Sequence, residues 1–150
     1  MNEVKSIIFV CLGNICRSPI AQGVAQKYID ENKLDIIVDS AGTGDWHIGE
    51  APCPHSVTVA KMNNVDISKQ KARQVTKEDF INYDLVVALD DSNIANLKKL
   101  GATNILKLGT FGFDGKDVPD PYFFDGFEGF DKVFEMIDIC VKNLINKKLV

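Results

Sequence analysis

Residues 6–19 read SIIFVCLGNICRSP, an apolar run followed by a loop that carries two thiols and an arginine. The apolar run is typical of a buried β-strand. Ser18 and Pro19 predict a helix start, with Ser18 as the N-cap and Pro19 at the first helical position, where no backbone N–H is needed. Residues 11–17 are therefore predicted to form a tight loop between a strand and a helix.

The composition of this loop favours binding of a phosphate-like dianion. A helix N-terminus presents unpaired N–H groups and a partial positive charge, and the guanidinium of Arg17 can hold two anion oxygens at once. Gly13 and Asn14 tolerate positive φ, which lets successive amides point inward. The same field favours a thiolate at Cys11, which is the nucleophilic form. The structural alternative is a turn with a buried cysteine and a solvent-facing arginine.

Length and charge limit the class of protein. The chain has 150 residues, 45% of them hydrophobic, with a formal net charge of −4 at pH 7. We expect one domain over 1–150 and no nucleic-acid partner, since such proteins usually carry a cationic face. No apolar run approaches the roughly 18 residues that span a bilayer, and no signal-like segment opens the chain. These features predict a cytoplasmic protein without a membrane partner.

The cysteines and histidines predict neither a metal site nor a disulfide framework. The four cysteines lie at positions 11, 16, 53 and 140, without zinc-ligand clustering or the density of a small secreted protein. We therefore expect reduced thiols. The chain has only two histidines, too few for a convincing metal site, and we expect no cofactor.

Hydrophobic patterning predicts an α/β fold: a single-domain, four-stranded parallel sheet flanked by helices on both faces, with the phosphate-binding loop after the first strand. The predicted strands are Ser6 to Val10, Ile36 to Asp39, Leu85 to Leu89 and Ile105 to Lys107. The predicted helices are Pro19 to Asn32, Cys53 to Asn63, Thr76 to Ile81, Ser92 to Leu100 and about 127–146. In the last helix, helical spacing places one set of residues in the core: Val133, Phe134, Ile137, Cys140, Val141 and Leu144. Ligands of such sheets bind at the carboxyl ends of strands, which is where Cys11 lies.

With these motifs, essentially the whole chain resembles the low-molecular-weight protein tyrosine phosphatase family. The loop matches the family signature Cys-x5-Arg-Ser near the N-terminus. Other matching segments follow in the family's order: Asp39 to Thr43, Trp46, Ala72 to Gln74, Asp79-Phe80, Asp90 to Asn93 and Asp120 to Tyr122. The resemblance implies hydrolysis of phosphotyrosine in proteins through a phosphocysteine intermediate, without a metal. It also implies tyrosine-phosphorylated proteins as partners and phosphate-like anions as inhibitors.

A thiolate that attacks a phosphate monoester needs a general acid for the leaving group. Asp120 lies between Pro119 and Pro121, which stiffen the loop that presents it. The residues alone leave a simple turn role equally open, and the resemblance assigns Asp120 the acid role. Protonated Asp120 and ionised Cys11 together predict a bell-shaped pH profile on the acidic side of neutrality.

The resemblance implies that the rest of the loop, Leu12 to Arg17, binds phosphate through its amides, which includes Gly13, Asn14, Ile15 and Cys16. It further implies that the Ser18 hydroxyl bonds the thiolate, although helix capping alone would explain a serine there. A disulfide between Cys11 and Cys16 under peroxide follows from the family's redox protection; the alternative is that Cys16 is only a packed thiol.

Aromatic side chains near the site favour a rim for the phosphotyrosine ring. Trp46, His47, Tyr122 and Phe123 lie in loops and not at helical spacing, although ordinary core packing is the alternative. Departures from the family pattern include Cys53-Pro54-His55 in place of Asp-Pro-Arg, and Phe123 in place of a second tyrosine. Gln70 replaces a histidine of some relatives; it either supports Asn14 in its place, or the network around Asn14 differs.

Three other functions fit these residues less well: arsenate reduction, hydrolysis of phosphoarginine and binding of phosphotyrosine without hydrolysis. An arsenate reductase needs resolving cysteines, and none occurs between Cys53 and Cys140. A phosphoarginine phosphatase tends to carry threonine where this chain has Ile15. A phosphotyrosine-binding module would have lost the nucleophile or the acid, and both are present. In solution we expect a monomer or weak self-association through the aromatic rim.

Overall fold

The computed structural model describes residues 4–121 and 128–149. Its centre is a four-stranded parallel sheet in the order β2-β1-β3-β4. The strands are β1 (Ser6–Cys11), β2 (Ile37–Gly42), β3 (Leu85–Ala88) and β4 (Ile105–Lys107). The predicted α/β class and strand positions are confirmed, with ends that differ by at most three residues.

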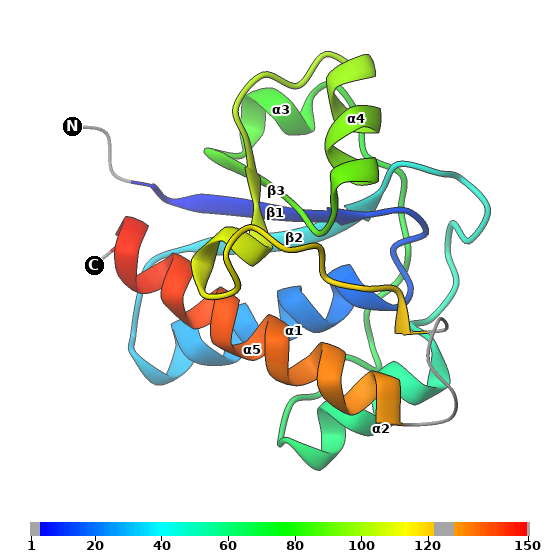
Figure 1. The fold of residues 1–150 in the computed structure, drawn as a ribbon, viewed down its shortest axis with the longest axis vertical. Helices are drawn as coiled ribbons and strands as arrows, with labels where there is room; N and C mark the ends of the chain where they lie inside the picture. Colours follow the sequence, from blue (N-terminus) through cyan, green and yellow to red (C-terminus); the bar gives the residue numbers. More distant parts are fainter. Residues whose placement is uncertain (1–3, 122–127, 150) are drawn as a thin grey trace.

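The helices lie on both sides of the sheet (Figure 1). They are α1 (Arg17–Glu31), α2 (Pro54–Met62), α3 (Asp79–Asn82), α4 (Asp91–Lys99), a 3₁₀ turn η1 (Leu108–Phe111) and α5 (Glu128–Leu149). In Figure 1, α1, α2 and α5 lie below the sheet, whereas α3 and α4 lie above it. Among the described residues, no helix combines the length and apolarity that a membrane span requires.

Alternate residues of β1 divide the core in two. Ile7 and Phe9 pack with α1 and α5 on one face, whereas Ile8 and Val10 pack with a smaller cluster that includes Leu97 of α4 on the other. All six residues of β1 are buried, as expected for a central parallel strand with both faces covered. This burial fixes the end of β1, and with it the position of Cys11.

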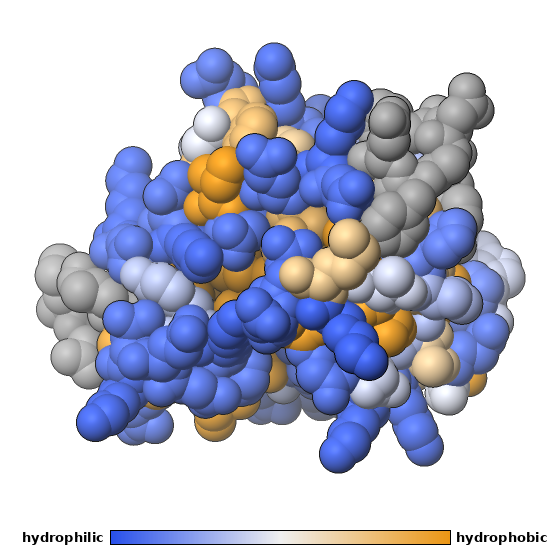
Figure 2. Space-filling view, turned by 90° about the horizontal axis from the view of Figure 1, so that it is seen from below, coloured by the Kyte–Doolittle hydropathy of each residue, from blue (hydrophilic) through white to orange (hydrophobic). Residues whose placement is uncertain are grey.

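The apolar stripe predicted for the final helix is confirmed. Val133, Ile137, Cys140, Val141 and Leu144 are fully buried in α5, and Phe134 is nearly so. Burial raises the pKa of the Cys140 thiol to about 11, so this cysteine is a structural residue of the core. Seen from the side of α1, α2 and α5, the molecular surface is mostly hydrophilic, with apolar residues in small separate patches (Figure 2).

The strand order places the loop after β1 at the point where the chain changes direction across the sheet. From β1 the chain adds β2 on one side and β3 on the other. Loops at such a point leave a crevice outside the carboxyl ends of the strands. The loop of residues 12–16 after β1 and Asp90 after β3 therefore lie at the same end of the sheet, beyond the carboxyl ends of the strands.

Candidate active site

The loop after β1 offers unpaired backbone donors. Within the described ranges, none of the backbone N–H groups of residues 12–16 donates to a protein acceptor. The carbonyls of Cys11 and Leu12 accept hydrogen bonds from the N–H groups of Thr43 and Gly44, at 3.0 and 2.9 Å. The first residues after β2 thus bind the end of β1 and the loop through carbonyl groups, and the amides of the loop stay available to an anion.

Helix α1 begins earlier than the sequence predicts. It starts at Arg17, its N-cap is Cys16, and no side chain caps it. Ser18 therefore lies inside the first turn, and its predicted role as N-cap is wrong. The buried Ser18 hydroxyl instead contacts the Cys11 sulfur at 2.9 Å, because the first turn of the helix faces back across the loop.

A chain of hydrogen bonds leads through Asn14 to the Ser18 hydroxyl. The Arg73 backbone N–H donates to Asn14 Oδ1 at 3.0 Å, which orients the amide so that Nδ2 donates to Ser18 Oγ at 2.8 Å. Since Ser18 Oγ accepts this bond, its own hydrogen is free to point at Cys11 Sγ. A hydroxyl in this position is able to donate a charge-assisted hydrogen bond to a thiolate.

Asn14 also donates to Ser40 Oγ at 2.9 Å, and Ser40 in turn donates to Gln22 at 2.6 Å. Gln70 lies outside this network, since its amide donates to the Pro19 carbonyl at 3.1 Å. Gln70 therefore does not support Asn14 in place of the histidine of some relatives. The structure supports the other alternative, a different network around Asn14. Asn14 itself has φ of +58°, as predicted. Gly13 does not have positive φ, so that expectation is wrong.

The close packing of Gly13 and Gly42 holds the loop in shape. A Cβ on Gly13 would lie 3.0 Å from a ring carbon of His47, and a Cβ on Gly42 would lie 2.7 Å from the Leu12 carbonyl oxygen. Both distances are shorter than ordinary van der Waals contacts. The loop is therefore packed between the His47 ring and the end of β2.

Arg17 is buried and held at one end of its guanidinium. Its Nη1 donates to Asp90 Oδ2 at 2.7 Å and to the Val118 carbonyl at 2.9 Å. Within the part of the chain that the structure describes, Nε and Nη2 have no protein partner and can bind an anion. Sequence reasoning missed Asp90 as a site residue; its position directly after β3, at the same edge as Cys11, is the signal that could have identified it.

The loop that carries Asp120 is tied to this arginine and to the sheet. The Val118 N–H donates to the Leu89 carbonyl at 2.8 Å. Lys107 pairs with Asp117 at 2.7 Å and with Asp91 at 2.9 Å, and the hydrogen bond from Lys107 holds the pKa of Asp117 below its usual value. Asp120 is half-buried and follows two residues after the carbonyl that binds Arg17. The acid candidate and the arginine are thus mechanically linked.

The structure describes two of the four residues predicted to form the aromatic rim. Trp46 is 66% exposed, and its ring lies against Gly44. His47 pairs with Glu50 at 2.8 Å. Both residues lie in the loop after β2, beside the phosphate-binding loop. Tyr122 and Phe123 lie outside the described residues.

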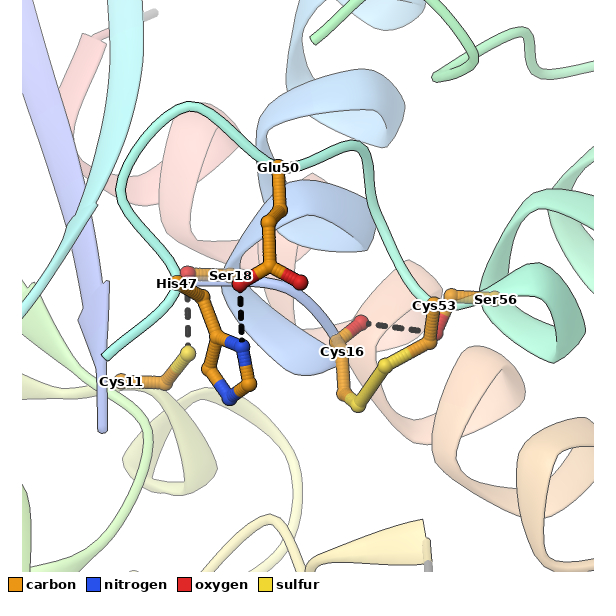
Figure 3. The surroundings of a disulfide bond; sticks show 7 residues. All are labelled: Cys11, Cys16, Ser18, His47, Glu50, Cys53 and Ser56. Carbon is orange, nitrogen blue, oxygen red and sulfur yellow. Dashed lines mark hydrogen bonds and ion pairs between the residues drawn. A yellow bond between two sulfur atoms is a disulfide. The ribbon is translucent and has the colours of Figure 1, made fainter. Parts of the chain in front are cut away.

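The expectation that all four cysteines are reduced thiols is wrong. The structure contains a disulfide between Cys16 and Cys53, with the two Cα atoms 5.4 Å apart (Figure 3). Only Cys11 and Cys140 are free thiols, so not all four cysteines are reduced. Cys16 is bonded to Cys53 here because the loop after β2 brings the start of α2 against the start of α1. The Cys11–Cys16 disulfide expected under peroxide stays a prediction.

Comparisons with known proteins agree with this geometry. Residues 6–149 match the family model for low molecular weight phosphotyrosine protein phosphatase. The low molecular weight protein-tyrosine-phosphatase PtpA of Staphylococcus saprophyticus is 40% identical over 146 residues, covering 94% of this chain and 92% of that protein. The low molecular weight phosphotyrosine protein phosphatase of Sus scrofa is 35% identical, with 95% of each chain covered.

A crystal structure of a protein tyrosine phosphatase from Entamoeba histolytica, with Hepes in its active site, has a TM-score of 0.88 and 34% identity to this chain. The alignment covers 95% of this chain and 96% of that one. Sequence and fold thus match the same enzymes over nearly their full length. The chain belongs to the low molecular weight phosphotyrosine protein phosphatase family and is a protein tyrosine phosphatase.

Proposed function

We propose that this enzyme hydrolyses phosphotyrosine in proteins through a phosphocysteine intermediate. The observation that carries the proposal is the contact between Cys11 Sγ and Ser18 Oγ at 2.9 Å, beside a loop whose amides are unpaired among the described residues. A sulfur held by a hydroxyl donor, at the centre of unpaired N–H groups, is suited to attack a bound phosphate.

In the first step, the Cys11 thiolate attacks phosphorus in line with the leaving phenolate. The amides of residues 12–17 and the guanidinium of Arg17 stabilise the charge on the equatorial oxygens. Asp90 and the Val118 carbonyl hold Nη1 of Arg17, so that its remaining nitrogens are positioned before the substrate arrives. Asp120 gives a proton to the phenolate oxygen.

In the second step, Asp120 accepts a proton from the water that attacks the phosphocysteine. The Cys11 sulfur then leaves as a thiolate, and the hydrogen bond from Ser18 stabilises its charge. The same donor that favours the nucleophile therefore also favours it as a leaving group. This sequence needs acid and base in turn from one carboxyl group, as expected of a two-step displacement.

Ring specificity is proposed to come from the loop residues around the phosphate site. Trp46 and His47 line one side, and Tyr122 and Phe123 are proposed for the other. Ile15 favours phosphotyrosine over phosphoarginine. The cytoplasmic location and the monomeric or weakly associating state stay predictions.

The test is hydrolysis of a phosphotyrosine peptide and of phosphoarginine by wild-type protein, Cys11→Ser and Cys140→Ala, across pH and with a chelator present. We expect metal-independent turnover of phosphotyrosine, its loss in Cys11→Ser and its retention in Cys140→Ala, which removes a thiol outside the site. Preference for phosphoarginine would overturn the role given to Ile15. Tight binding without turnover in wild type would identify a capture module instead.

A further inference from the structure

The disulfide between Cys16 and Cys53 has no part in the phosphatase mechanism. It joins the phosphate-binding loop to the start of α2 across 37 residues of sequence. Cys16 is the N-cap of α1 and Cys53 is the N-cap of α2. Both sulfur atoms therefore lie at the positive end of a helix, where the thiolate, the form that exchanges with disulfides, is favoured.

Contacts that do not involve sulfur also hold the two residues together. The Cys53 N–H donates to the Ile15 carbonyl at 2.7 Å, and the Ser56 hydroxyl donates to the Cys16 carbonyl at 3.1 Å. Neither bond uses a sulfur atom, so we expect both to hold Cys53 beside the loop when the disulfide is reduced. In the structure the two Cα atoms lie 5.4 Å apart, a separation typical of disulfides.

Cys11 keeps its contact with Ser18 while Cys16 is bound to Cys53. In Figure 3 the side chain of Cys16 runs to Cys53, and the sulfur of Cys11 faces Ser18. Cys11 is a free thiol in this state. Formation of the Cys16–Cys53 disulfide is therefore compatible with an intact nucleophile. Cys16 lies five residues after Cys11 in the same loop and is bonded to Cys53 on its other side.

We propose that Cys16 and Cys53 form a dithiol centre that returns oxidised Cys11 to its active form, with a hydroperoxide as the oxidant. The proposal rests on the Cys11 thiolate of the proposed function. The thiolate attacks the peroxide O–O bond to give a sulfenic acid, and the leaving oxygen departs as water or an alcohol. The Cys16 thiolate then attacks the Cys11 sulfur, which forms the Cys11–Cys16 disulfide and releases the second oxygen as water.

In the last step, the Cys53 thiolate attacks the sulfur of Cys16. The Cys16–Cys53 bond forms, the Cys11–Cys16 bond breaks, and Cys11 leaves as a thiolate. In sum, one hydroperoxide is reduced and two thiols are oxidised to the disulfide seen in this structure. A dithiol reductant that opens this disulfide resets the centre. The two bonds from Cys53 N–H and Ser56 keep the resolving thiol in place for this exchange.

The test begins with fully reduced protein and one molar equivalent of hydrogen peroxide, without reductant. Phosphatase activity is followed in time, samples are quenched with an alkylating agent, and disulfide connectivity is read by peptide mass spectrometry. In wild type we expect activity to fall and then recover within seconds to hours, the range of disulfide exchange, with Cys16–Cys53 as the end product. Cys140→Ala should behave as wild type.

Cys53→Ser should stop at the Cys11–Cys16 disulfide, stay inactive, and recover only on addition of a dithiol reductant. Cys16→Ser should show no spontaneous recovery and should proceed to irreversible oxidation of Cys11. A stable Cys11–Cys16 product in wild type would overturn the proposal. So would formation of Cys16–Cys53 in Cys11→Ser as fast as in wild type. Mass spectrometry reports the disulfide connectivity whether or not the protein is active. Failure of the proposed exchange can therefore be told apart from failure of the proposed phosphatase reaction.

Discussion

Asp90 Oδ2 lies 2.7 Å from Arg17 Nη1, and this ion pair joins the loop after β1 to the loop after β3. Both side chains are largely buried, with exposed fractions of 8% for Arg17 and 16% for Asp90. The other oxygen of Asp90 accepts a bond from the Asn93 N–H at 2.7 Å and caps α4. One carboxylate thus holds both a helix start and Arg17, the arginine proposed to bind phosphate.

Substitution of Asp90 should separate these two roles. Asn is as good an N-cap as Asp, so Asp90→Asn keeps the cap and removes the charge. We expect kcat/KM for phosphotyrosine to fall about 10²-fold through misplacement of Arg17. Asp90→Ala should lose about 1 kcal/mol more in the free energy of unfolding than Asp90→Asn, because the cap is also lost. Equal activity of Asp90→Asn and wild type would show that Arg17 needs no partner.

Ser18→Ala tests the hydroxyl donor at the nucleophile. Loss of one donor to a charged group in a site of this kind costs about 10²-fold in kcat, and both the attack and the departure of Cys11 should slow. Burst kinetics with a chromogenic aryl phosphate would show whether the intermediate accumulates. Ser68→Ala is the matched control, since among the described residues Ser68 bonds only to Asp66 in an exposed turn. An unchanged kcat in Ser18→Ala would contradict the role given to the hydroxyl.

Gly42→Ala tests the packing beneath the loop. The new Cβ would lie 2.7 Å from the Leu12 carbonyl oxygen and close to two further backbone atoms, so the loop must move. We expect kcat to fall at least tenfold, with a cost in stability of about 1–3 kcal/mol from overpacking. Ile29→Val in α1 is the control, because it costs about 0.5–1.5 kcal/mol in the core without touching the loop. Its kcat should equal that of wild type.

The ion pairs of Arg73 predict a pH dependence of stability. Arg73 contacts Asp79 at 2.9 Å and Asp39 at 3.0 Å. Burial raises the pKa of Asp79, but hydrogen bonds from Arg73 and Thr76 outweigh it and hold that pKa below its usual value. A lowered pKa means that this stabilisation is complete above the unfolded value of about 3.9 and is lost as pH falls through the folded value.

Asp79→Asn should therefore lower the thermal midpoint at pH 7, and the difference from wild type should shrink as pH falls below about 4. Thermal unfolding at a series of pH values is the measurement. Since the Arg73 N–H also holds Asn14, some loss of activity should accompany the loss of stability. A difference in midpoint that stays constant down to pH 3 would exclude ionised Asp79 as the cause.

Asp120→Asn tests the general acid through the leaving group. An amide cannot give up or accept the proton, so the alkaline limb of the kcat profile should disappear. The loss in kcat should be about 10²-fold or more for phosphotyrosine and much smaller for an aryl phosphate with an acidic phenol, which needs less protonation. Asp114→Asn, in the turn before this loop, is the control. Equal losses for both leaving groups would argue against an acid role.

Local sequence determined the strands, the buried stripe of α5 and the identity of the loop after β1. These features depend on apolar spacing and on residues next to one another in the chain, as with Cys11, Arg17 and Ser18. The sequence also indicated that ligands would bind at the carboxyl end of β1, since this follows from parallel strands in general.

Tertiary structure alone decided which distant residues complete the site. Asp90 pairs with Arg17 across 73 positions, the Arg73 N–H orients Asn14 across 59, and Cys53 takes Cys16 as its partner across 37. Helix α1 also starts at Arg17 and not after Ser18, so that the Ser18 hydroxyl contacts Cys11 and does not cap the helix. In each case the partner depends on how the loops after β1, β2 and β3 pack together at the carboxyl end of the sheet. That packing cannot be predicted from residues that are neighbours in the sequence.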